Sequence, residues 1–172
     1  ITSGAQLRPA ISQLDAALSL QLSTFASAEA QLANLADDIA YLSHDFDDAL
    51  RAGLFEIADI AHLPQVKKAL AHIQRTYGEI EGGRLTHELV RRLISVFVED
   101  LLRQSTANLL ALDAGHPDDI RAASAAVIAF SPEMAADLEA LREFLFTNMW
   151  RHFKVNRMTT KAKRVVTDLF NL

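Results

Sequence analysis

The sequence contains no cysteine and, in 172 residues, only six glycines, four prolines and one tryptophan. The absence of cysteine excludes disulfides, cysteine-ligated zinc, iron–sulfur clusters and a thiol nucleophile. It also suits a reducing compartment, so we expect a cytoplasmic protein. The longest nearly apolar run, residues 122–130, is far shorter than the ~20 residues that span a bilayer, and no basic-then-apolar leader opens the chain. We therefore expect no membrane partner.

The net charge of −5 is unevenly distributed along the chain. The segment 151–172 carries one acid, Asp168, and six basic residues: Arg151, Lys154, Arg157, Lys161, Lys163 and Arg164. Its net charge is +5, which leaves −10 on the preceding 150 residues. A basic segment of this kind meets phosphate, nucleic acid or an acidic neighbour, or it docks on its own domain as a solvated face. Binding to nucleic acid is supported only by the charge of this segment, so we do not expect nucleic acid as a partner.

The scarcity of glycine and proline, together with abundant alanine and leucine, favours helix throughout the chain. Short alternating β-branched runs, which are typical of strands, are absent. The pattern predicts helices over 11–22, 27–51, 65–77, 85–112, from 131 to about 155, and from Thr159 or Thr160 to Phe170, with one or two further turns in 54–60. We predict an all-α fold, a bundle of about six helices, forming a single region over 1–172.

Apolar residues at helical spacing predict which faces of the two longest helices are buried. In the first, the stripe consists of Ala30, Leu32, Leu35, Ile39, Leu42 and Phe46. In the second, it consists of Leu89, Leu93, Val96, Phe97, Leu101 and Leu102. Gly53 and Gly78 are expected to end helices, and Ser131-Pro132-Glu133 is expected to begin one.

The densest chemistry lies between Asp37 and Asp48, where five acids accompany a tyrosine and a histidine. On a helix, Asp37, Tyr41 and Asp45 are spaced i, i+4, i+8 and share one face. Two carboxylates that flank a phenol repel each other unless a cation or a hydroxylated substrate lies between them. The alternative is that these acids form the solvated face of an amphipathic helix, and the residues alone leave both interpretations open.

Other motifs are excluded by single residues. His87-Glu88 begins like a zinc-protease motif, but Arg91 stands where the second histidine would be. Glu81-Gly82-Gly83-Arg84 lacks the Lys-Ser/Thr that completes a phosphate loop. The six histidines contain no i, i+4 pair, so no catalytic residue is identified from the sequence.

Two long blocks of the sequence resemble bacterial deoxyguanosine triphosphate triphosphohydrolase-like proteins of the HD-domain phosphohydrolase superfamily. The first contains Ala36-Asp37-Asp38-Ile39-Ala40-Tyr41 and His44-Asp45-Phe46-Asp47-Asp48. The second runs from Phe144 through Arg151-His152-Phe153-Lys154 to Phe170. The blocks occur in the family's order and at about its separation. The resemblance implies an HD-domain-like fold, of which this chain is the C-terminal half.

The resemblance also assigns roles to the face of the first long helix, over 27–52. Family members hold a divalent cation, of Mg or Mn type, with a His, a His-Asp pair and a late Asp. By this resemblance Asp37 is the late Asp, whereas the other ligands belong to the N-terminal half. Tyr41 is the tyrosine beside the sugar and phosphates, and Asp45 accepts a hydrogen bond from the deoxyribose 3′-hydroxyl.

The implied reaction is metal-dependent hydrolysis of a deoxynucleoside triphosphate, dGTP or similar, to a deoxynucleoside and inorganic triphosphate. The family commonly forms homo-oligomers, so Arg151, Arg157 and Lys161 are expected to contact phosphates or another subunit. The chain opens on Ile1 and lacks the upstream ligands, so we expect it to be inactive by itself. The alternative is a non-catalytic helical regulatory or scaffold module derived from the same fold.

Overall fold

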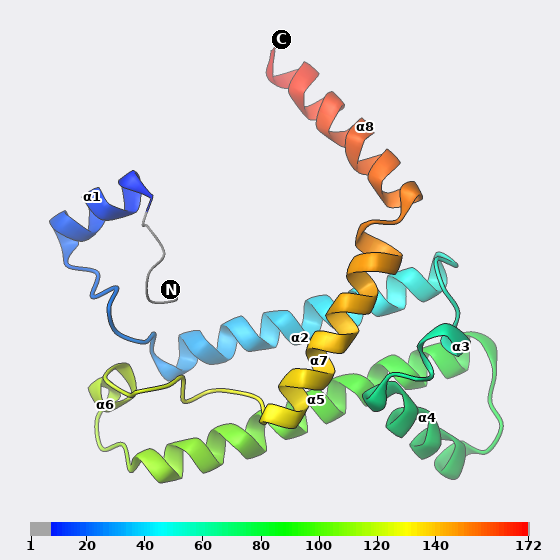
Figure 1. Ribbon diagram of the computed structural model, residues 1–172, viewed down its shortest axis with the longest axis horizontal. Helices are drawn as coiled ribbons and strands as arrows, with labels where there is room; N and C mark the ends of the chain where they lie inside the picture. The colour runs from blue at the N-terminus through cyan, green and yellow to red at the C-terminus, as the bar shows by residue number, and fades with distance from the viewer. Residues whose placement is uncertain (1–7, 172) are drawn as a thin grey trace. The chain divides into compact units, whose positions relative to one another are not determined.

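The computed structural model describes residues 8–171, and within that range every regular element is helical and no strand is present (Figure 1). The predicted all-α fold is confirmed. The two ends of the expected helical region, 1–7 and Leu172, lie outside the described residues. None of the helices described is long and apolar enough to span a membrane.

The elements follow one another as helices and one π-helical turn. They are α1 (Pro9–Leu18), α2 (Ala28–Arg51), α3 (Ile57–Ile60), α4 (Pro64–Tyr77), α5 (Gly82–Leu112), α6 (Pro117–Arg121), α7 (Pro132–Leu145), the π-turn η1 (Phe146–Trp150) and α8 (Phe153–Phe170).

Local capping chemistry fixes several of these boundaries where the sequence predicts them. Helix α4 begins with Pro64 in its first turn and ends at Gly78, which has a φ of 71° and donates its N–H to the carbonyl of Gln74. Helix α7 begins after Ser131, whose hydroxyl accepts a hydrogen bond from the N–H of Met134. Helix α2 ends at Arg51, before Gly53.

The described residues form two compact units. The first comprises the residues up to Leu35 together with Leu102–Ala129. In it, the side-chain oxygen of Gln31 accepts hydrogen bonds from the N–H groups of Val127 and Ile128, at 3.0 and 3.1 Å. Asn108 on α5 donates to the carbonyl of Val127 at 2.9 Å. These amide side chains replace regular backbone pairing for the loop that precedes α7.

The second unit comprises Ala36–Leu101 together with the residues from Phe130 onward, and it contains most of the core. Four helices contribute apolar faces that are buried: Ile39, Leu42, Phe46 and Ala49 on α2; Val66, Ala69 and Ile73 on α4; Leu89, Leu93, Phe97 and Leu101 on α5; Met134, Leu138, Leu141 and Leu145 on α7. Polar contacts join α4 to α7, where Gln65 donates to Asp137 and Lys68 to Glu133.

The predicted stripes are buried mainly in the parts that belong to the second unit. Leu32, near the start of α2, is 42% exposed, and Leu102 on α5 is 58% exposed. Both residues belong to the first unit, which contributes little to the core. Periodicity therefore identifies the correct face of each helix, but not where along the helix that face is covered.

Two predicted boundaries near the end of the chain are wrong. The helix expected from 131 to about 155 ends at Leu145 and passes into η1, after which the backbone is extended at His152. The last helix, expected to begin at Thr159 or Thr160, begins at Phe153, because His152 acts as its cap and accepts from the N–H of Lys154. No glycine or proline marks the break, so the sequence contains no breaker signal there.

Candidate functional site

Helix α2 carries the predicted Asp37–Tyr41–Asp45 face within the second unit. The three side chains differ in exposure: Asp37 is exposed, Tyr41 is 63% exposed, and Asp45 is half-buried. On the opposite side of the helix, Leu42, Phe46 and Ala49 pack into the core and fix its orientation. The face therefore runs from solvent at Asp37 to a partly enclosed carboxylate at Asp45.

Asp45 is held by the only tryptophan in the sequence. The indole Nε1 of Trp150, at the end of η1, donates a hydrogen bond to Oδ2 of Asp45 at 2.6 Å. Burial raises the pKa of the Asp45 carboxyl, and the hydrogen bond from Trp150 offsets part of this increase because it favours the charged form. The neighbouring Asp48 carboxylate raises the pKa of Asp45 further, whereas His44 lowers it.

The π-turn η1 arranges aromatic and cationic groups around Trp150, the residue that donates to the Asp45 carboxylate. The rings of Phe146 and Trp150 meet edge to face, with 6.3 Å between their centroids. The guanidinium of Arg151 lies 4.9 Å from the centroid of the Phe146 ring. Arg151, one of the predicted phosphate or oligomer contacts, therefore lies next in sequence to the residue that binds Asp45.

An ion pair joins α7 to α2 beside Asp37. Arg142 Nη2 lies 3.3 Å from Oδ2 of Asp38, and Arg142 Nη1 lies 3.6 Å from Glu139 on its own helix. Both Arg142 and Asp38 are partly exposed, so the pair is expected to contribute little stability. The pair engages Asp38 and not Asp37, which is exposed.

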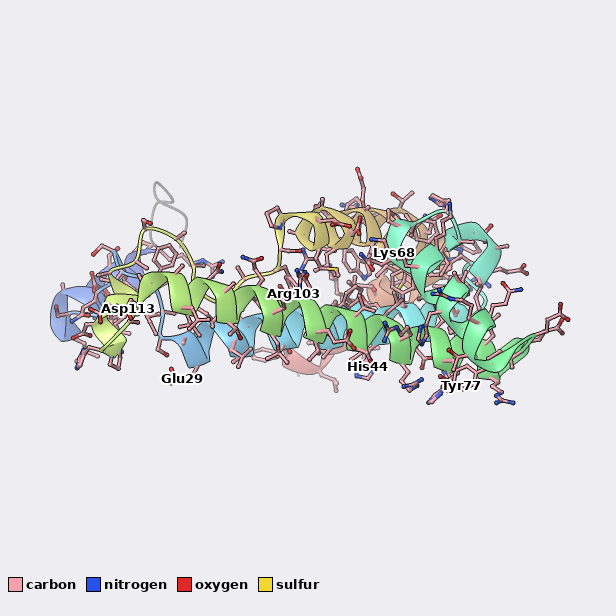
Figure 2. All side chains as sticks on the ribbon, turned by 90° about the horizontal axis from the view of Figure 1, so that it is seen from below. Glu29, His44, Lys68, Tyr77, Arg103 and Asp113 are labelled. Carbon is pink, nitrogen blue, oxygen red and sulfur yellow. The ribbon has the colours of Figure 1, made fainter. Side chains whose placement is uncertain are left out.

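The remaining predicted residues lie on α8. Arg157 and Lys161 are exposed, and no ion pair or hydrogen bond within residues 8–171 joins either one to α2. His44 is exposed on α2 (Figure 2), in agreement with adjacent helical residues pointing about 100° apart. The structure therefore brings Asp45 and the Trp150–Arg151 segment together, and leaves Arg157 and Lys161 apart from that site.

Sequence reasoning missed Trp150 and Arg142 as residues of the site. The segment 144–153 is unusually rich in bulky side chains, but its bulk predicts core packing and does not identify a partner. The usable signal was chemical: a lone tryptophan has an N–H that requires an acceptor when it is buried, and α2 offers a row of carboxylates.

The described residues do not form a metal site by themselves. No group of three or more acidic, histidine or cysteine side chains converges within 8–171. Asp37 is exposed and stands alone as a candidate ligand, whereas Mg²⁺ and Mn²⁺ sites are built from several oxygen or nitrogen ligands. Any divalent cation bound to Asp37 would need ligands from outside this range.

Comparison with known proteins gives consistent matches. Residues 128–172 match the model of the phosphohydrolase-associated domain. The chain is 44% identical over 168 residues to the deoxyguanosinetriphosphate triphosphohydrolase-like protein of Parvibaculum lavamentivorans, covering 98% of the chain and 42% of the relative. It is 43% identical over 170 residues to the protein of the same name from Azorhizobium caulinodans, covering 99% of the chain and 43% of the relative.

The chain spans about two fifths of the length of these relatives, whereas the relatives match almost all of it. The two blocks that carry the resemblance in the sequence are therefore parts of one continuous match. The chain belongs to the deoxyguanosinetriphosphate triphosphohydrolase-like family, as a C-terminal part of such a protein.

Proposed function

We propose that this chain supplies the sugar-binding helix of a metal-dependent deoxynucleoside triphosphate triphosphohydrolase. Membership of a family named for triphosphohydrolase-like proteins supports the reaction class. The observation that carries the assignment is the graded face of α2, where a half-buried carboxylate, Asp45, follows an exposed phenol and an exposed carboxylate. dGTP or a related deoxynucleotide is the proposed substrate.

In the overall reaction, water adds to the α-phosphorus and the bond from that phosphorus to the 5′-oxygen breaks. The 5′-oxygen takes up a proton and leaves as the deoxynucleoside, and inorganic triphosphate is the second product. A divalent cation would polarise the phosphate, with Asp37 as one of its ligands. The residues of this chain bind the sugar. The Tyr41 ring lies beside the sugar, and Asp45 accepts a hydrogen bond from its 3′-hydroxyl.

Partners and location follow from the same proposal. The basic side chains Arg151, Arg157 and Lys161 either neutralise the triphosphate or contact another copy in a homo-oligomer. Arg151 is the strongest of the three for phosphate, because it follows Trp150 directly. The proposed enzyme acts in the cytoplasm, where its deoxynucleotide substrates are found.

The test uses the product of the complete coding sequence, whatever its length, assayed for triphosphate release from the four deoxynucleoside triphosphates with Mg²⁺ or Mn²⁺. We expect release by the native protein and a loss of at least about a hundredfold in the Asp37→Ala variant, with helix content unchanged. Asp48→Ala is the matched control, because it removes an exposed acid from the same helix. The 172-residue chain alone should release no triphosphate.

The absence of a three-residue metal cluster within residues 8–171 favours one alternative, a helical regulatory or scaffold module without catalysis. This alternative predicts that the complete product hydrolyses none of the four substrates. It also predicts that Asp37→Ala leaves the binding of a protein partner unchanged. Triphosphate release that depends on Asp37 would exclude it.

A further inference from the structure

The contact between Trp150 and Asp45 divides the two oxygens of one carboxylate between different tasks. Oδ2 accepts the indole N–H at 2.6 Å, a short distance that is typical of a bond to an ionised acceptor. Oδ1 receives no hydrogen bond from any residue within 8–171. The indole nitrogen can only donate a hydrogen bond. It can therefore hold the Asp45 carboxylate, but it cannot accept a hydrogen bond from a substrate hydroxyl in place of that carboxylate.

The π-turn is the structural device that brings the indole to α2. Leu138, Leu141 and Leu145 form the buried face of α7, and in a continued α-helix the next residue on that face would be 148 or 149. The wider turn, closed by the N–H of Arg151 on the carbonyl of Phe146 at 3.0 Å, holds one extra residue, so that Trp150 takes the place that residue 149 would have in a continued α-helix. π-Turns are less favourable than α-helix and occur frequently at functional sites.

Neighbouring side chains support the ring of Trp150 in this position. The edge-to-face contact with Phe146 and the guanidinium of Arg151 over Phe146 stack three groups from one short segment. Asn148 donates to the carbonyl of Phe144 at 2.9 Å, which satisfies a backbone acceptor where the regular ladder is interrupted. The indole is therefore held from its own segment as well as by Asp45.

We propose that Trp150 is the positioning residue of the sugar site: its N–H occupies Oδ2 of Asp45, so that Oδ1 alone is presented to the 3′-hydroxyl of the deoxyribose. This proposal rests on the proposed function. An acceptor fixed in this way favours substrates that supply the hydroxyl, because a substrate without it leaves the carboxylate oxygen unpaired. Trp150 acts through Asp45 and does not itself contact the substrate.

The kinetic test compares dGTP with 2′,3′-dideoxyGTP, which lacks the 3′-hydroxyl, in the complete coding-sequence product. Trp150→Phe keeps an aromatic ring and removes the N–H. We expect kcat/KM for dGTP to fall about tenfold to a hundredfold, while the value for dideoxyGTP falls much less, so that discrimination between them narrows. Phe153→Leu is the matched control, since it removes an exposed aromatic ring just after the turn but leaves the indole N–H and its contact with Phe146, and it should keep the discrimination.

A spectroscopic test detects the contact between Trp150 and Asp45 without an activity assay. Trp150 is the only tryptophan of the 172-residue chain, so its emission reports on Asp45 directly. We expect the emission of the native chain to follow a titration whose midpoint lies above the ordinary aspartate pKa, and Asp45→Asn to abolish that titration. An identical titration in Asp45→Asn, or no titration in the native chain, would overturn the proposed contact.

The two tests separate the failure of this inference from the failure of the proposed function. Hydrolysis of dGTP with unchanged discrimination in Trp150→Phe overturns the role of Trp150 and leaves the enzyme assignment intact. Absence of hydrolysis of every deoxynucleotide by the native complete product overturns the enzyme assignment and the positioning role together. In that case the emission titration still decides whether Trp150 holds Asp45.

Discussion

Asp100 binds Ser131 with both of its carboxylate oxygens, at the point where α7 begins. Oδ2 accepts a hydrogen bond from the N–H of Ser131 at 2.8 Å, and Oδ1 accepts one from the Ser131 hydroxyl at 2.9 Å. The same hydroxyl accepts the N–H of Met134, so one buried acid on α5 orients the residue that caps α7. The start of the helix that leads to Trp150 is therefore fixed by a side chain of another helix.

Replacing Asp100 by alanine should lower the free energy of unfolding by about 2–4 kcal/mol, because two hydrogen bonds to a charged acceptor are lost and the partly buried N–H of Ser131 is left unpaired. Ser131→Ala, which removes the cap and the hydroxyl bond to Asp100 but keeps the N–H bond, should cost less, about 1–2 kcal/mol. Urea unfolding followed by Trp150 emission measures both values. Glu99→Ala changes an exposed acid next to Asp100 and should stay within about 0.5 kcal/mol. Equal effects at positions 99 and 100 would contradict this account.

Two glycines should respond in opposite directions to alanine. Gly78 ends α4 with φ 71° and ψ −149°, a conformation essentially restricted to glycine, so Gly78→Ala should destabilise by about 1–3 kcal/mol although no atom lies within 4 Å of the added Cβ. Gly83, in the first turn of α5, has no positive φ and equal space. Gly83→Ala should stabilise by about 0.4–1 kcal/mol. Thermal unfolding of the two variants gives the comparison, and destabilisation by both would refute it.

Replacing Ser43 by alanine should stabilise the folded chain. Its side chain is 4% exposed on α2, and its hydroxyl oxygen has no hydrogen-bond partner within the described residues. Removing an unpaired buried hydroxyl should raise the free energy of unfolding of the 172-residue chain by about 1 kcal/mol. Ser95→Ala is the control, because the Ser95 hydroxyl donates to the carbonyl of Arg91 and its removal gains nothing. A loss of stability in Ser43→Ala would show that the hydroxyl is paired in solution.

Asp45 should make the stability of the chain depend on pH in a defined direction. Because burial raises its pKa in the folded state, the folded chain binds the proton more tightly than the unfolded chain does. The stabilising contribution is therefore complete below the ordinary aspartate pKa of about 4 and is lost as pH rises through the folded value. Trp150 from η1 and Asp48 and His44 on α2 are the groups that set this value.

The measurement is urea unfolding of the native chain and of Asp45→Asn at a series of pH values. The free energy of unfolding of the native chain relative to the variant should decrease from about pH 3 to pH 7, since the amide does not titrate. Asp48→Asn, which retains Asp45, should keep the decrease and move it to lower pH, because Asp48 raises the pKa of Asp45. A difference that increases with pH would show that Asp45 is stabilised as the carboxylate.

The sequence predicts those features of the fold that depend on local chemistry. The Ser131-Pro132 start, the Gly78 end and the bounds of α2 are all signalled by residues within a few positions of the boundary, although Asp100 on α5 also holds Ser131. The break between η1 and α8 is not predicted, because no residue there disfavours helix strongly and tertiary packing decides the conformation.

The candidate site shows the same division. The shared face of Asp37, Tyr41 and Asp45 follows from helical spacing alone, so the order of residues along α2 is sufficient to predict it. The partner of Asp45 lies 105 residues away in the sequence, and periodicity contains no information about such a pair. The exposure of Tyr41 and the partial burial of Asp45 likewise depend on which elements cover α2, which a single sequence does not specify.

The π-turn of η1 also limits how the chain can change in length. One residue of an α-helix corresponds to a rotation of about 100°, and the π-turn already holds one residue more than an α-helical turn. Deleting one residue between Phe146 and Trp150 would restore a regular helix with the tryptophan at position 149, whereas inserting one would turn everything after it by about that angle. The segment between α5 and α6, which is exposed and irregular, faces no such constraint. Natural and engineered insertions should therefore accumulate near residues 113–116 and be selected against at 146–150.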